Sequence, residues 1–147
     1  MEHKTITTPK RSGRKTESVV ALIAHDAKKA DIVMFAIKHI ETLSKCVLVA
    51  TGSTGSMISD YTGLEVKLML AGPDGGDLQI GGLIASGEID MVIFFRDALT
   101  AQPHEPDISA LMRVCDVHNV PLATNPLSAN MLLRYLEHRP GSLRFVA

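Results

Sequence analysis

The chain has 147 residues, 46% of them hydrophobic and 21% charged, which predicts one domain with one hydrophobic core. Its formal net charge of −1 argues against a general binder of nucleic acids or of membrane surfaces. No apolar run approaches the roughly 18 residues that a membrane-spanning helix requires, so we expect a soluble protein.

The first 17 residues differ from the rest of the chain. They lack hydrophobic periodicity, contain Pro9 and Gly13, and have no apolar segment like that of a signal peptide. We therefore expect a disordered basic tail at residues 1–17 and a single domain at 18–147. The basic residues of the tail are Lys4, Lys10, Arg11, Arg14 and Lys15.

Neither cysteine belongs to a recognisable metal-binding or redox motif. Cys46 and Cys115 lack the spacing of either kind of site, so we expect free thiols in a reducing compartment. The sequence also shows no cluster of metal-ligating side chains that would suggest a metal-dependent reaction.

Short apolar runs alternate with helical patterns along the chain. Residues 19–24 form a continuous apolar run typical of a strand buried on both faces. Residues 28–43 carry apolar side chains at spacings of three and four, which predicts an amphipathic helix. The alternation then repeats, with strands expected at 46–50, 66–70, 91–95 and 120–123 and helices around 57–58, 78–86, 108–118 and 128–136.

This alternation predicts the fold class and the place of the site. Parallel neighbours need right-handed crossovers, which put helices on both faces of the sheet. We therefore expect an α/β fold, a Rossmann-like three-layer sandwich with a five-stranded, mainly parallel sheet. Ligands bind such sheets at the carboxyl ends of the strands. Polar and glycine clusters follow the predicted strands there, at 25–26, 51–55, 72–77, 97–107 and 124–125.

The segment Thr51-Gly52-Ser53-Thr54-Gly55 follows the second predicted strand and opens a helix. Its backbone N–H groups and hydroxyls would face the positive end of the helix dipole, which suits phosphate. The simpler alternative is that Ser53 or Thr54 caps the helix while the glycines permit a tight turn. The spacing matches neither a full Walker motif nor a dinucleotide fingerprint.

The loop at residues 72–77 contains three glycines and a proline, more than a turn requires. Its composition indicates that a ligand approaches the backbone closely. Asp77, at the end of the loop, has two interpretations. It either caps the following helix or serves as a base held at the ligand edge of the sheet.

The segment 97–107 is stiffened by Pro103 and Pro106 around His104. An imidazole flanked by carboxylates is suited to carry protons near neutral pH. Alternatively, Asp107 caps the next helix and His104 only packs within the loop. We interpret the stiff loop as a means of presenting His104 to a ligand.

Four further polar or charged residues lie next to the predicted strand ends. His25-Asp26 ends the first strand, and Lys29 follows at the opening of the first helix, where it could neutralise a phosphate. Arg96 could contact an anion, a partner subunit or only the neighbouring Asp97. The sequence alone leaves these three roles of Arg96 open.

Four of these segments together resemble the methylglyoxal synthase family. They keep the order and spacing of that family across about residues 18–130. Chance similarity in four motifs at once is improbable, although each alone is modest. The motifs are Ala24-His25-Asp26 with Lys29; 50–55; 72–77 with Gln79; and Pro103-His104-Glu105-Pro106-Asp107.

The resemblance implies conversion of dihydroxyacetone phosphate to methylglyoxal and inorganic phosphate, with no cofactor. It further implies a cytoplasmic homo-oligomer, typically a hexamer, with phosphate as product and as allosteric inhibitor. The same fold also serves as a regulatory module of carbamoyl phosphate synthetase and as part of a bifunctional purine enzyme. A non-catalytic sensor of phosphate or nucleotide is therefore the alternative function, and an oligomeric scaffold is a third.

The motif match also implies roles for individual residues. Asp77 takes the position of the catalytic base, and Ala71 stands where a serine is expected, which removes one hydroxyl from the phosphate side. The positions that handle protons and orient substrate are His104, Asp107, Asp97, His25 and Asp26. The positions that bind phosphate and substrate are Lys29, Thr51, Gly52, Ser53, Thr54, Gly55 and Gly72.

Overall fold

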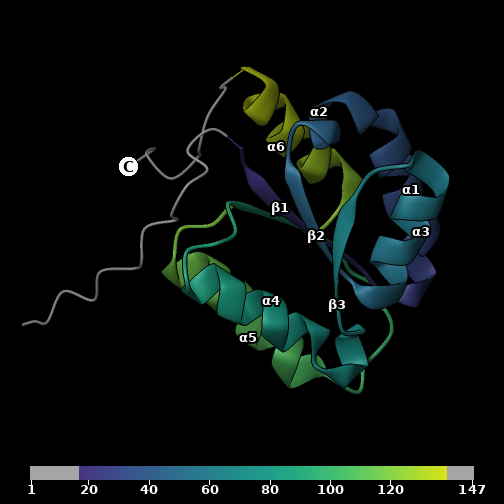
Figure 1. Cartoon of the computed structure of the whole chain (residues 1–147). Coiled ribbons are helices and arrows are strands. Elements are labelled where there is room, and N and C mark those ends of the chain that lie inside the picture. The colour runs from purple at the N-terminus through teal and green to yellow at the C-terminus, as the bar shows by residue number, and fades with distance from the viewer. Residues whose placement is uncertain (1–16, 139–147) are drawn as a thin grey trace, which may run out of the picture.

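The computed structural model describes residues 17–138 and shows one five-stranded sheet (Figure 1). Neighbouring strands pair in parallel throughout, in the order β3-β2-β1-β4-β5, which confirms the predicted Rossmann-like α/β fold. The expected basic tail lies outside the described residues apart from Glu17. The strands are β1 (Val19–Ala24), β2 (Val47–Thr51), β3 (Val66–Met69), β4 (Met91–Phe95) and β5 (Leu122–Ala123).

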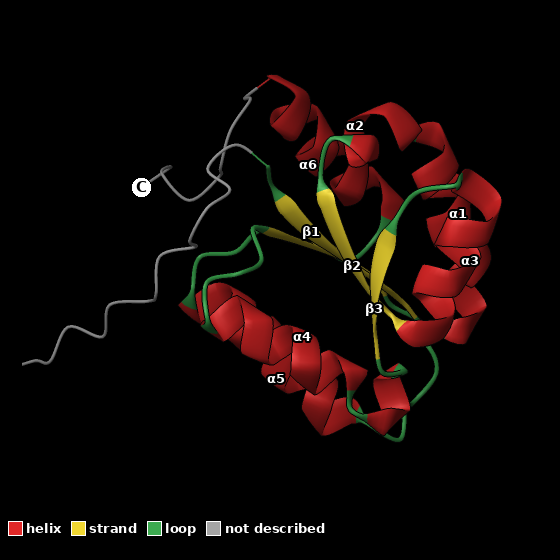
Figure 2. Ribbon diagram, viewed as in Figure 1, coloured by secondary structure: helices red, strands yellow, loops and turns green. Residues whose placement is uncertain are grey.

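Helices cover both faces of the sheet (Figure 2). One layer contains α1 (Lys29–Lys38), α2 (Ile40–Ser44), α3 (Gly52–Thr62) and α6 (Pro126–His138). The opposite layer contains α4 (Gly76–Ala85) and α5 (Glu105–Val117), which lie side by side. Two short 3-10 turns, η1 (Asp26–Lys28) and η2 (Gly72–Asp74), follow strand ends.

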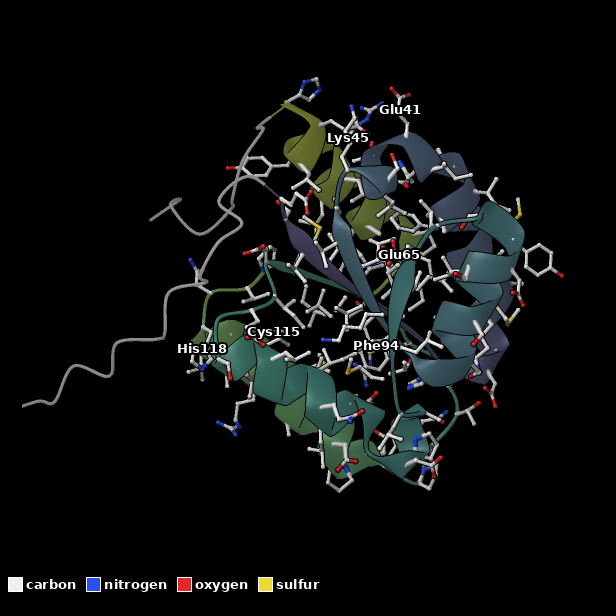
Figure 3. The ribbon with its side chains drawn as sticks, in the orientation of Figure 1. Glu41, Lys45, Glu65, Phe94, Cys115 and His118 are labelled. Atoms are coloured by element: carbon white, nitrogen blue, oxygen red, sulfur yellow. The ribbon has the colours of Figure 1, made fainter. Side chains whose placement is uncertain are left out.

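Every residue of β1 is buried because the central strand packs against both helical layers. Its side chains point alternately to the two helical layers, so the predicted continuous apolar run contributes residues to two hydrophobic cores. Val20, Leu22 and Ala24 belong to the core under α1, α3 and α6, and Val19, Ala21 and Ile23 to the core under α4 and α5. Phe94 and Cys115 belong to this second core, and both are labelled in Figure 3.

The prediction of one helix over residues 28–43 is wrong. The chain leaves helical geometry at His39, with φ −113° and ψ 25°, which separates α1 from α2. His39 packs its ring against Phe35, and its Nε2 lies 2.8 Å from Asn130 Oδ1 on α6. The break therefore accompanies a contact between segments that are distant in the sequence. The helical periodicity of residues 28–43 contains no information about such a contact.

Several helices also begin earlier than their apolar patterns predict. α4 begins at Gly76 rather than at Leu78, and α5 begins at Glu105 rather than at Ile108. The first turns of these helices hold polar residues at the carboxyl edge of the sheet, so the apolar periodicity starts only after them. Pro106 is compatible with a first turn because its missing N–H would have no partner there.

Within residues 17–138, no helix combines the length and the apolar character needed to cross a membrane.

Candidate active site

The strand order places the topological switch point of the sheet between β1 and β4. From β1 the chain moves to β2, towards one edge of the sheet, and from β4 it moves to β5, towards the opposite edge. Loops therefore diverge at the carboxyl ends of these two strands, and such a switch point is where open α/β sheets bind ligands. His25 follows β1 there, and Arg96 and Asp97 follow β4.

His25 is held in one orientation by β4 and the loop after it. Its Nδ1 accepts the backbone N–H of Asp97 at 2.8 Å, and its own backbone N–H donates to Phe95 O at 3.1 Å. Because Nδ1 is an acceptor, the neutral ring carries its proton on Nε2. Nε2 is buried and has no hydrogen-bond partner among the described residues. His25 thus presents a free N–H donor.

Asp77 is a buried carboxylate at the start of α4, with 1% of its surface exposed. Neither carboxylate oxygen has a hydrogen-bond partner in the described chain, so the capping interpretation of Asp77 does not apply. Burial raises the pKa of Asp77, the charge of His104 opposes this shift, and the negative charge of Asp107 adds to it. A carboxylate without stabilising donors and with a raised pKa is suited to accept a proton.

His104 lies directly beside Asp77. Its Nε2 is 3.4 Å from Asp77 Oδ2, and its ring centre is 6.1 Å from that of His25, nearly perpendicular to it. His104 is the N-terminal cap residue of α5, and its carbonyl oxygen accepts the N–H groups of Asp107 and Ile108. The alternative that Asp107 caps this helix is therefore wrong.

Gly72 forms the wall of the site next to these two side chains. A Cβ added at Gly72 would lie 3.0 Å from His104 Nε2 and 3.3 Å from Asp77 Oδ1. The other two positions of the loop require glycine for different reasons. Gly75 adopts φ +106°, which favours glycine, and a Cβ at Gly76 would overlap the carbonyl of Leu70. Of these three glycines, only Gly72 brings the backbone close to Asp77 and His104.

The segment 51–55 forms the start of α3, with Thr51 as the cap residue. The N–H of Gly52 donates to Leu70 O at 3.3 Å, whereas those of Ser53 and Thr54 have no partner within the helix. A Cβ at Gly55 would overlap Leu68, so this glycine permits packing of α3 against β3. The N–H groups of Ser53 and Thr54 are therefore the ones that the helix leaves without a partner.

Lys29 supplies a positive charge at this helix start. Its Nζ donates to Ser53 Oγ and to Asp26 Oδ1, both at 2.6 Å, and so joins η1 and α1 to α3. The side chain of Asp26 is 96% exposed, and its pKa is lowered chiefly by the hydrogen bond from Lys29. Asp26 thus orients Lys29 from the solvent side.

Asp97 and Asp107 are not part of the close pair that Asp77 forms with His104. The Asp97 carboxylate accepts the N–H of Leu99 at 3.2 Å, and hydrogen bonds from Thr100 and Leu99 lower its pKa. Its carboxylate therefore braces its own loop while its backbone N–H orients His25. Asp107, in the first turn of α5, is close enough to raise the pKa of Asp77 by its charge.

Arg96 is a site residue to which sequence reasoning assigned no role. Within residues 17–138, five buried side-chain nitrogen and oxygen atoms lack a hydrogen-bond partner. Four of them belong to His25, Asp77 and His104, and the fifth is Arg96 Nε. Its position at the end of a central strand was visible in the sequence, but the burial of its Nε was not.

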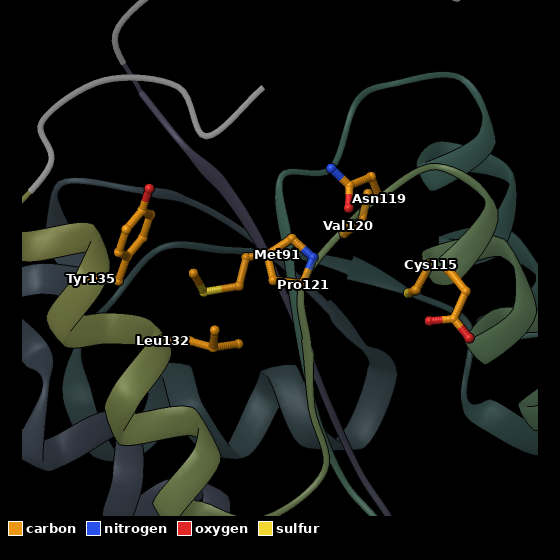
Figure 4. Close-up of a pocket in the computed structure, with 8 residues that line it drawn as sticks. Met91, Cys115, Asn119, Val120, Pro121, Leu132 and Tyr135 are labelled. Carbon is orange, nitrogen blue, oxygen red and sulfur yellow. The ribbon is translucent and has the colours of Figure 1, made fainter. Parts of the chain in front are cut away.

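A separate hollow of about 340 Å³ lies at the opposite edge of the sheet, beside the start of β4 (Figure 4). Cys115, Leu132 and Tyr135 line it together with residues 119–121. None of the expected site residues contributes to this hollow. Among residues 17–138, no group of three or more His, Cys, Asp or Glu side chains is arranged to hold a metal ion.

The fold and the site together define a class of protein: an open α/β domain with a buried carboxylate–imidazole pair and a helix start that carries a lysine side chain. Residues 31–124 match the family model of the MGS-like domain. The chain is 64% identical over 115 residues to a methylglyoxal synthase of Clostridium botulinum (strain Alaska E43), an alignment covering 78% of this chain and 97% of that relative.

Two further comparisons agree. The chain is 61% identical over 125 residues to a methylglyoxal synthase of Caldicellulosiruptor saccharolyticus, covering 85% of this chain and 89% of that relative. The crystal structure of methylglyoxal synthase from Elizabethkingia anophelis matches with a TM-score of 0.75 at 46% identity, covering 80% of this chain and 77% of that one. The chain belongs to the methylglyoxal synthase family and is an enzyme of the lyase class.

Proposed function

We propose that this protein converts dihydroxyacetone phosphate to methylglyoxal and inorganic phosphate, and is thus a carbon–oxygen lyase acting on a phosphate ester. The observation that carries the proposal is the Asp77 carboxylate. It is buried, lacks hydrogen-bond donors and faces His104 Nε2 at 3.4 Å. A carboxylate in this environment is suited to act as the base that removes a proton from a bound substrate.

The reaction is an elimination in which atoms balance without water or a redox partner. Asp77 takes a proton from the hydroxymethyl carbon next to the carbonyl, and the electrons of that C–H bond form an enediolate. The electrons then expel phosphate as its C–O bond breaks. The enol that remains takes up at carbon the proton that Asp77 removed, which regenerates the carboxylate and gives methylglyoxal. The hydroxyl proton of the substrate leaves with the phosphate.

The imidazoles and the helix starts supply the remaining requirements. His25 Nε2–H and His104 would donate hydrogen bonds to the oxygens that become negative in the enediolate. The unpartnered His25 Nε2 and the nearby His104 ring support this role. Lys29 and the N–H groups of Ser53 and Thr54 form the place for the phosphate. Gly72 allows the substrate to lie against the backbone beside the base.

Direct turnover tests this proposal. The purified protein is expected to release phosphate from dihydroxyacetone phosphate and to form methylglyoxal in equal amounts, with the same rate before and after treatment with a chelator. Phosphate release and methylglyoxal are measured separately. Tight binding of phosphate or nucleotide without turnover at any substrate concentration would instead support the sensor.

The sensor alternative has one physical argument against it. A binding module for phosphate gains nothing from a buried carboxylate that accepts no hydrogen bond, because its charge repels the ligand. Asp77 and the nearby Asp107 are both carboxylates of this region. The presence of both carboxylates therefore favours a catalytic site over a phosphate-binding module. The hexamer, allosteric inhibition by phosphate and the cytoplasmic location stay predictions that rest on the family.

Replacing Lys29 with methionine is expected to weaken binding of substrate and of inorganic phosphate. Loss of a charged hydrogen bond costs about 1.5–3 kcal/mol, so KM should rise roughly tenfold or more, with a smaller change in kcat. Steady-state kinetics and calorimetric titration with phosphate measure both effects. Lys38→Met, at an exposed position of the same helix, is the matched control. An unchanged KM in Lys29→Met would remove Lys29 from the phosphate site.

A further inference from the structure

Arg96 shares an unusual property with the proposed catalytic residues. Buried polar atoms in proteins are nearly always hydrogen-bonded, so each exception requires an explanation. In the described part of the chain these exceptions occur only in His25, Asp77, His104 and Arg96. The first three face the place of the substrate, which suggests that Arg96 Nε belongs to the same region.

The backbone places Arg96 next to His25. The last residue of β1, Ala24, pairs in register with Phe95, the last residue of β4, so the residues after them are neighbours. His25 also bonds to the residues on both sides of Arg96, through Phe95 O and the N–H of Asp97.

Strand alternation assigns both side chains to the same face of the sheet. Arg96 directly follows the last residue of β4, and alternation continued by one residue puts it on the side of Phe94, which packs under α4 and α5. The His25 ring lies edge-on to the Phe94 ring, with centres 5.1 Å apart, and so occupies that face too. Arg96 therefore places a permanent charge beside the His25 ring.

We propose that Arg96 is a positioning residue for the reaction: its charge adds to burial in keeping the neighbouring His25 ring neutral, with Nε2–H as donor to the substrate oxygen. The inference rests on the proposed function, since it assigns His25 a donor role in that reaction. A protonated His25 would carry a second hydrogen on Nδ1, which would face the N–H of Asp97. Two donors would then oppose each other, and the ring would lose its orientation.

The other charges around His25 act in both directions. Burial is the main cause that lowers the pKa of His25, and electrostatic interactions with His104 and with the Arg96 charge lower it further. Glu105 on α5 and Asp97 after β4 raise it. The remaining carboxylates of the region are Asp26 on η1, which turns to Lys29, Asp77 on α4, which faces His104, and Asp107 in the first turn of α5. Removing the charge of Arg96 leaves the two acidic neighbours of His25 less opposed, so the pKa of His25 rises.

The test compares Arg96→Gln with Arg96→Lys, which keeps the charge. Arg113→Gln, at an exposed position of α5, is the matched control. Imidazole NMR spectra recorded across pH follow His25, whose signals are identified by their loss in His25→Gln. We expect a higher His25 pKa in Arg96→Gln and wild-type titration in Arg96→Lys and Arg113→Gln. The acid limb of kcat/KM should move to higher pH in Arg96→Gln only.

Two results would overturn the inference. One is an unchanged His25 titration in folded Arg96→Gln, and the other is an Arg96→Lys protein that titrates like Arg96→Gln, since charge would then not be the cause. Failure of the proposed function is distinguishable, because wild-type protein would then release no phosphate while the NMR titrations still report on Arg96 and His25. Thermal unfolding of each variant confirms that it is folded.

Discussion

Asp77→Asn is expected to reduce turnover of dihydroxyacetone phosphate by about 10³-fold or more while the protein stays folded. A general base contributes roughly 10²–10⁴-fold to a rate, and asparagine has nearly the shape of aspartate but cannot accept the proton. Residual kcat is measured at saturating substrate. Retained turnover in Asp77→Asn would remove Asp77 from the role of the base.

The same substitution is expected to stabilise the fold. The pKa of Asp77 is raised by burial, so the folded protein binds a proton more readily than the unfolded chain between the ordinary and the raised pKa. Stability therefore falls as pH rises through that range, and the ionised carboxylate is a cost above it. Asparagine removes this cost, so the free energy of unfolding at pH 7.5 should rise by on the order of 1 kcal/mol.

Asp60→Asn is the matched control, because Asp60 is exposed on α3. Its turnover should equal that of the wild type, and its stability should change by less than about 0.5 kcal/mol. Denaturant unfolding at two pH values measures the comparison. The difference in stability between Asp77→Asn and the wild type should shrink at low pH, where the carboxyl group is protonated. A difference independent of pH would show that ionisation of Asp77 is not its source.

Gly72→Ala is expected to lower kcat/KM by about 10²-fold with little loss of stability. The added methyl would stand 3.0 Å from His104 Nε2 and 3.3 Å from Asp77 Oδ1, so both side chains must shift by a few tenths of an ångström. It would also occupy space beside the base. Small displacements of reacting groups cost about this much in rate. The backbone tolerates alanine because Gly72 does not have a positive φ.

Gly82→Ala, on α4, separates the effect of the site from the effect of losing a glycine. A Cβ at Gly82 would meet no atom within 4 Å, and alanine favours helix over glycine by about 0.5–1 kcal/mol. This control should therefore gain stability and keep full turnover. Wild-type kcat/KM in Gly72→Ala would show that the substrate does not use the backbone there. A large fall in its unfolding temperature would show that Gly72 is needed for folding instead.

The strands were the easiest elements to predict from the sequence. β1 and β4 are buried on both faces, so each is a continuous apolar run that needs no knowledge of its neighbours. Helix boundaries were harder. The first turns of α4 and α5 face the site and are polar, and the break at His39 accompanies a contact with Asn130 on α6. These features depend on residues far apart in the chain.

The site was predicted as a set of residues but not as an arrangement. Clusters at strand ends must meet in a parallel sheet, so Asp77, His104 and His25 could be grouped before the structure was known. Their roles differ for reasons of local geometry. Gly55 packs against Leu68 instead of facing the anion side, and the Asp97 carboxylate braces its own loop. Arg96 could not be assigned, because its buried Nε is a property of the folded chain.

The sequence by itself determined the alternation of strands and helices, the edge of the sheet that holds the site and the residue types gathered there. These follow from local periodicity and from the rule that parallel strands end on one edge. Only the tertiary structure decided that Asp77 has no hydrogen-bond donor, that His25 carries its proton on Nε2, and that Gly72 lies against both Asp77 and His104. Burial and hydrogen-bond partners set these properties, and both come from segments distant in the chain.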